Sequence, residues 1–196
     1  MHKSRIEGAV RSAGRSLDAE EMAFMVLSDK TERPLRERIA WQLHRDLADS
    51  GMIVAQDWHG VDLAILEDRR PSAVVAMESM RSFEAVYGHV AIQRWVSRVQ
   101  KDLRSARRLS GEGEVYALVV LSHVSDEVPV DLDGVVQYLP RINRSLRTKT
   151  STEVIESARS QLEEGLAEHG DVDYIRLGFG KCWGLRTEVH AYLVTA

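Results

Sequence analysis

The fold is decided by residues 60–80, which read Gly60-Val-Asp-Leu-Ala-Ile-Leu-Glu-Asp-Arg-Arg-Pro-Ser-Ala-Val-Val-Ala-Met-Glu-Ser-Met80. Two apolar runs lie in this stretch, Val61–Leu66 and Ala73–Met77, with a short polar turn between them. The first run is interrupted only by Asp62, and the second is wholly apolar. Short apolar runs bounded by turn residues are typical of buried β-strands. The stretch therefore predicts two core strands joined as a hairpin.

Each predicted strand carries one acid at an end. Asp62 lies at the start of the first strand, and Glu78 follows the second. In an antiparallel hairpin these two ends are neighbours, so the two carboxylates should lie together, and a divalent cation would relieve their repulsion. The alternative is that each acid is neutralised by an arginine. Asp62 would then pair with Arg69 or Arg70, and Glu78 with Arg81.

Composition indicates a globular chain without a membrane segment. The chain has 196 residues, of which 44% are hydrophobic and 29% charged, which is enough for one domain with a sizeable core. It lacks an apolar run of about 18 residues and the apolar core of a signal peptide. A single cysteine, Cys182, fits a reducing compartment. We therefore expect a cytoplasmic protein that makes no membrane contact.

Periodicity along the rest of the chain predicts alternating helices and strands. Helices are expected over Lys3–Leu27 in two pieces, Pro34–Asp49, Phe83–Leu109 and Thr152–His169, and further strands over Met52–Gln56, Glu114–His123, Asp173–Phe179 and Leu185–Val194. A helix that joins two core strands implies parallel pairing between them. The expected fold is an α/β domain over residues 1–196, with a mixed central sheet flanked by helices. Residues 1–30 would form a helical packing segment, and residues 124–196 further helices and a terminal hairpin.

The predicted helix over residues 83–109 carries a one-signed stripe of basic residues. Their spacing of three or four residues places them on one helical face: Arg94, Arg98, Lys101, Arg104 and Arg108. A second basic group comprises Arg141, Arg144 and Arg147. Because the net charge is −4, such clusters are unusual, and both phosphate contact and a solvated face remain open interpretations.

Together these features resemble the PD-(D/E)xK nuclease superfamily, which has the restriction-endonuclease-like fold. That family places an acid on a helix, an Asp on the first strand of a hairpin, and an (Asp/Glu)-x-Lys motif on the second, followed by a helix and a strand. Glu37, Asp62 and Glu78 match the three acids in order, and the resemblance covers about residues 33–123. By periodicity alone Glu37 indicates a solvated acid, because it lies off the apolar stripe of its helix.

The resemblance implies a magnesium or manganese site for phosphodiester hydrolysis. Asp62 and Glu78 would bind Mg²⁺ or Mn²⁺, together with the backbone carbonyl of Ser79, and Glu37 would bind a second ion or a metal-bound water. Oxygen ligands suit these cations, and the metal would activate water and stabilise the leaving oxygen. The resemblance also makes a homodimer the expected assembly.

One residue departs from the family pattern, since Met80 occupies the position of the motif lysine. Methionine has similar length but no charge and no hydrogen-bond donor. Three explanations are open: a protein that binds without cutting, a lysine supplied from elsewhere, or an engineered replacement that traps a substrate complex. Lys101 is the best substitute and Arg81 a weaker one.

Two functions follow from the sequence. The first is a metal-dependent nuclease that acts on DNA in preference to RNA, with Asp62, Glu78 and Lys101 as its catalytic residues. The second is a non-catalytic protein of the same fold, which serves as a nucleic-acid-binding or protein-interaction subunit. A small-molecule enzyme is disfavoured, because the sequence has no glycine-rich phosphate loop, no nucleophile elbow and no paired zinc ligands.

Overall fold

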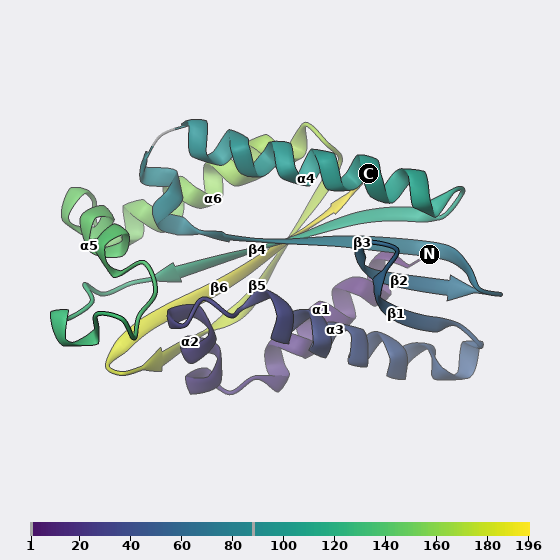
Figure 1. The fold of residues 1–196 in the computed structure, drawn as a ribbon, viewed down its shortest axis with the longest axis horizontal. Coiled ribbons are helices and arrows are strands. Elements are labelled where there is room, and N and C mark those ends of the chain that lie inside the picture. Colours follow the sequence, from purple (N-terminus) through teal and green to yellow (C-terminus); the bar gives the residue numbers. More distant parts are fainter. Residues whose placement is uncertain (1, 88) are drawn as a thin grey trace.

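The computed structural model describes residues 2–87 and 89–196, which are built around one six-stranded sheet (Figure 1). Its strands are β1 (Ile53–Trp58), β2 (Val61–Glu67), β3 (Arg70–Arg81), β4 (Glu114–Val124), β5 (Asp171–Cys182) and β6 (Leu185–Thr195). They lie in the order β1-β2-β3-β4-β6-β5. β3 and β4 run parallel, and all other neighbours are antiparallel. The predicted α/β class and the mixed sheet flanked by helices are confirmed.

Helices cover both faces of the sheet (Figure 1). One face is covered by α1 (Lys3–Ser16), α2 (Ala19–Leu27) and α3 (Glu32–Leu47), and the other by α4 (His89–Ser110) and α6 (Ser151–Ala167). The short α5 (Leu139–Thr148) lies beyond one end of the sheet. The helix predicted from Phe83 begins later, because Ser82–Tyr87 form a 3-10 helix. Within the described chain, no helix has the length and apolarity that crossing a membrane requires.

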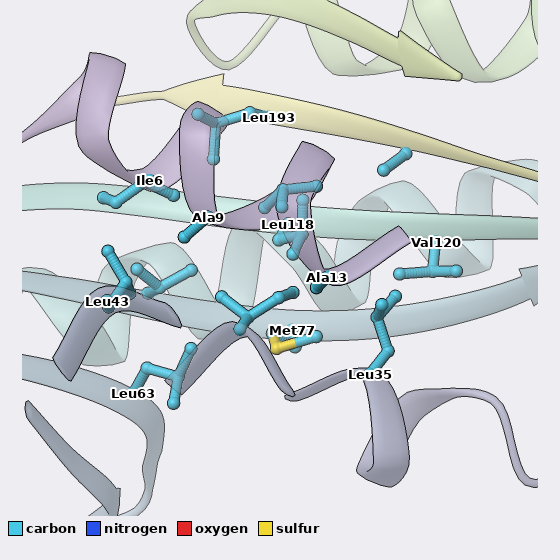
Figure 2. Close-up of a cluster of buried hydrophobic side chains, with 14 of the residues drawn as sticks. Ile6, Ala9, Ala13, Leu35, Leu43, Leu63, Met77, Leu118, Val120 and Leu193 are labelled. Carbon is cyan, nitrogen blue, oxygen red and sulfur yellow. The ribbon is translucent and has the colours of Figure 1, made fainter. Parts of the chain in front are cut away.

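The core between the sheet and α1–α3 is built from the periodic residues of those helices (Figure 2). The stripe Leu35, Ile39, Leu43 and Leu47 is completely buried, as its spacing of four predicts. Burying four such side chains stabilises the fold by roughly 6–12 kcal/mol before entropy is counted. Against them pack Leu63, Met77, Leu118 and Val120 from the sheet.

β4 is the central strand, and it is buried on both faces. Leu118 and Val120 point to the core under α1–α3, whereas Val119 and Leu121 point to the core under α4 and α6. Every residue from Val115 to Leu121 is buried, which is why the sequence shows an unbroken apolar run here. The predicted parallel pairing is also present, because β3 and β4 are linked through α4.

A glycine fixes the contact between the terminal hairpin and α2. A Cβ added at Gly180 would lie 1.8 Å from the carbonyl oxygen of Ala19, whereas a Cβ at Gly8 on α1 would meet nothing within 4 Å. We therefore expect Gly180→Ala to lower the free energy of unfolding by about 2 kcal/mol or more, because backbone must move. Gly8→Ala should raise it by about 0.5–1 kcal/mol through helix propensity. Urea denaturation of both variants checks this, and equal stabilities would contradict the packing described here.

Candidate carboxylate site

The candidate site lies where β3 continues past the start of β2. At the start of β2, pairing with β3 begins at Leu63, which lies opposite Val75. Beyond Val75, β3 continues alongside β4 to Arg81. At Glu78, β3 therefore has a neighbouring strand on one side only. At this opening the chain can place polar side chains beside a buried sheet.

Asp62 occupies the opening, and both of its carboxylate oxygens are engaged. Oδ1 accepts a hydrogen bond from Nη1 of Arg36 at 2.7 Å, and Oδ2 accepts one from the backbone N–H of Met77 at 2.7 Å. Arg36 also binds Asp57 at 2.9 Å. Asp62 is therefore paired with an arginine, as one of the two alternatives predicts. The arginine is Arg36 from α3, however, and neither Arg69 nor Arg70.

Glu78 projects from β3 toward α4, where it shares a side-chain hydrogen bond with Asp102. A bond between two carboxyl groups requires a proton. Desolvation, followed by repulsion from Asp102 and Glu32, raises the pKa of Glu78 to about 7, while Arg98 opposes the shift. Desolvation also raises the pKa of Asp102. Glu78 does not pair with Arg81, whose guanidinium binds Asp29.

The acid that α3 brings to this site is Glu32, whereas Glu37, the acid expected from this helix, lies on another side of it. Glu32 lies in the first turn of α3, and Ser79 is close enough to lower its pKa. Desolvation, with repulsion from Asp62, raises its pKa. Glu37 is exposed and pairs with Arg33 at 2.9 Å. Five residues separate Glu32 from Glu37, so they point in different directions around the helix.

The structure therefore brings together four acids rather than the expected three. We expect Asp62 and Glu78 to meet, and both lie near the same two further acids. Asp62 acts on Glu32 and Asp102, and Glu32 and Asp102 act on Glu78. Asp102 is the one acidic residue of α4, and it is not among the site residues predicted from the sequence. The sequence contains one signal for Asp102. A single acid among basic residues on a helix is a candidate for a specific interaction in a functional site.

The four acids suit a hard cation in chemistry but are not arranged as ligands. Carboxylate and hydroxyl oxygens are the donors that Mg²⁺ and Mn²⁺ prefer. However, nowhere in residues 2–87 and 89–196 do three or more His, Cys, Asp or Glu side chains converge closely enough to hold a metal ion. Arg36 holds one carboxylate, and a proton links two others. Cation binding would require Asp62 to leave Arg36 and the proton to leave Glu78.

Basic side chains border these acids from α4. Arg98 and Lys101 both act on Asp102, and each lowers its pKa against the effect of burial. Arg98 also stacks on Trp95, with 4.7 Å from the guanidinium carbon to the ring centroid. All five members of the predicted stripe are exposed, namely Arg94, Arg98, Lys101, Arg104 and Arg108. The stripe thus continues from the acids along an accessible helix face.

The second basic group is on α5, which contacts the 3-10 helix Ser82–Tyr87 and α6. Arg141 and Arg144 are exposed, and Arg147 pairs with Glu127 at 3.3 Å. This group therefore lies at the end of the sheet rather than along the stripe. His59, which is close to Asp62 in the sequence, is an exposed turn residue that packs on Trp58.

Met80 is completely buried within the apolar core under α4 and α6. It lies two residues after Glu78, so both side chains project from the same face of β3. A methionine in this place packs well, but it gives the acids neither a charge nor a donor.

Comparison with known proteins adds no family to these observations. None of the family models, curated proteins or solved structures compared with this chain matches it.

The carboxyl pair makes stability depend on pH in a defined direction. The folded pKa of Glu78 is about 7, above its ordinary value of 4.5, so its protonated form stabilises the fold fully below pH 4.5 and this contribution is lost as the pH rises through 7. Relative to Glu78→Gln, the wild type should lose about 1–2 kcal/mol of unfolding free energy between pH 5 and pH 8 after solvent screening. Urea denaturation at several pH values measures this. Glu37→Gln is the control, and a constant difference between wild type and Glu78→Gln would contradict the shared proton.

Proposed function

We propose that this protein is a metal-dependent phosphodiesterase of the nuclease type that acts on DNA. The observation that carries the proposal is the hydrogen-bonded carboxyl pair of Glu78 and Asp102, beside Asp62 and Glu32, at the edge of an exposed basic stripe. Buried acids repel each other unless a proton or a cation neutralises them. A phosphate group reaching them along the stripe would meet Arg98 and Lys101 first.

The order of the elements supports this proposal. The elements follow one another as the PD-(D/E)xK resemblance implies. Helix α3 carries an acid, the hairpin of β2 and β3 carries one acid on each strand, and α4 then leads to the parallel strand β4. The acid on α3 differs from the expected one, but it is on the expected helix. The restriction-endonuclease-like fold is thus part of the proposal. A cytoplasmic location is also part of it, because the one cysteine of the chain, Cys182, is buried and free.

Asp62, Glu78 and Asp102 would hold Mg²⁺ or Mn²⁺, with the Ser79 carbonyl as a neutral ligand. When bound, the metal would lower the pKa of a water molecule and stabilise charge on the leaving oxygen. The chain's own residues would do the rest. Arg98 would orient a phosphate, and Lys101 would supply the donor that Met80 lacks. Arg36 would keep its pairing with Asp57 when Asp62 turned to the cation.

The second candidate is a non-catalytic protein of the same fold that binds nucleic acid or a protein, with a homodimer as its expected assembly. Two observations favour it: Met80 is apolar and buried, and Arg36 already neutralises Asp62. Such a protein would keep the basic stripe and bind in a salt-sensitive manner without cutting.

Metal binding tests the shared premise. Calorimetry with Mn²⁺ should detect a site whose affinity rises about ten-fold or more between pH 6 and pH 8, because the cation competes with the proton on Glu78. Asp62→Ala and Asp102→Asn should abolish it, whereas Glu37→Ala should leave it unchanged. Binding that persists in Asp62→Ala, or that disappears in Glu37→Ala, would contradict the assignment.

Restoring the lysine tests catalysis. Met80→Lys would place an ammonium on the same strand face as Glu78, so we expect Mg²⁺-dependent cleavage of DNA to appear or to rise at least ten-fold. Met80→Leu is the control that keeps the packing, and circular dichroism should show that both variants are folded. If the wild type already cuts, Lys101→Ala should lower the rate by about 100-fold. A folded Met80→Lys variant that binds Mn²⁺ and cuts neither single nor double strands would favour the non-catalytic candidate.

A further inference from the structure

A second candidate binding surface lies on the β5–β6 hairpin, away from the carboxylates. Phe179 on β5 is 67% exposed, which makes it the most exposed aromatic side chain among the residues described. The guanidinium of Arg176 lies 5.4 Å from the centroid of its ring. Large aromatic side chains are usually buried, so an exposed ring beside a cation indicates a candidate binding surface.

Phe179 lines a cavity of about 390 Å³, which also contacts Arg176, Lys181, Ser125 and Thr187. A cavity of this size accommodates a ligand of the size of a nucleotide. Thr187 is buried, and its hydroxyl has no hydrogen-bond partner within the described chain. The cavity therefore has an exposed aromatic ring on one side and a buried polar residue, Thr187, in its lining.

The cations at this cavity are in excess over the acids. Arg186 is neutralised by Asp126, with Nη2 to Oδ1 at 2.6 Å. Neither Arg176 nor Lys181 takes part in an ion pair among residues 2–87 and 89–196. Glu188 is the acid of the lining, and it lies 3.5 Å from His190. Two cations thus remain available to a negatively charged ligand beside the exposed ring.

We propose that this surface binds a single-stranded nucleic acid, with one base stacked on Phe179 and the adjacent phosphates held by Arg176 and Lys181. Every base has a π-face that stacks on an aromatic ring, and every nucleotide carries a phosphate next to its base. A base inside a duplex has both faces covered, so the surface selects unpaired strands. It suits a second copy of the chain less well, because the irregularity between Arg176 and Gly178 interrupts the edge of β5 that strand pairing needs.

This binding goes beyond the proposed nuclease function and does not require the carboxylates. The pairing pattern makes β3, β4 and β5 run in the same direction, so the hairpin tip and the end of β3 lie at the same end of the sheet (Figure 1). A strand held on Phe179 would therefore approach the end of the molecule where α5 presents Arg144.

Fluorescence anisotropy with a labelled oligothymidine of about 12 nucleotides, in EDTA, tests the proposal without metal or cleavage. The wild type should bind it at least ten-fold more tightly than a duplex of equal length. Phe179→Ala should weaken binding about ten-fold, the size of one lost stack, and Phe179→Trp should retain it. Lys181→Ala should reduce the slope of log affinity against log salt by about 0.7.

Two control variants remove the same chemistry elsewhere. Trp41→Ala deletes a ring on α3 that is 59% exposed, and Arg45→Ala deletes an exposed cation on the same helix; both should bind like the wild type. Equal binding by Phe179→Ala and Trp41→Ala would overturn the proposal. A second result would also overturn it. If Phe179→Ala loses a dimer in light scattering but keeps its affinity for the oligothymidine, the surface serves self-association. The Asp62→Ala variant should still bind the oligothymidine in EDTA. Binding at Phe179 can therefore be confirmed even if the proposed nuclease function fails.

Discussion

The candidate chemistry of this protein depends on a difference in length between two neighbouring strands. β3 has 12 residues and β2 has 7, so the last residues of β3 have a strand partner on one side only. Where pairing stops, the sheet opens between its two layers of helices. Side chains from α3, β2, β3 and α4 then approach one another.

Four acids at such an opening are costly, and the structure shows how each layer offsets the cost. On the side of α3, Arg36 neutralises Asp62. On the side of α4, Glu78 and Asp102 share a proton, and Arg98 moderates their repulsion. Neutralisation by a proton is weaker and more sensitive to pH than neutralisation by a fixed arginine. The α4 side is therefore the part of the site that a cation or a phosphate could change most readily.

The two candidate binding surfaces use different physical means. The stripe on α4 presents charge alone, which favours the evenly spaced phosphates of any nucleic acid. The β5–β6 hairpin presents a ring and two cations around a cavity, which favours an unpaired base next to a phosphate. Both are exposed, and β3 and β5 end at the same end of the sheet. A chain with both surfaces would discriminate between double-stranded and single-stranded segments.

The sequence by itself determined the strands, the helices other than α5 and the basic stripe, because periodicity and turn residues are local properties. It also indicated Asp62 and Glu78, since an acid at the end of an apolar run needs a partner wherever the strand lies. The tertiary structure alone decided that Glu32 rather than Glu37 faces the site, that Asp102 joins it and that Arg36 neutralises Asp62. Those choices depend on the rotation of a helix about its axis and on strand register, and both are fixed by packing between elements that are distant in sequence.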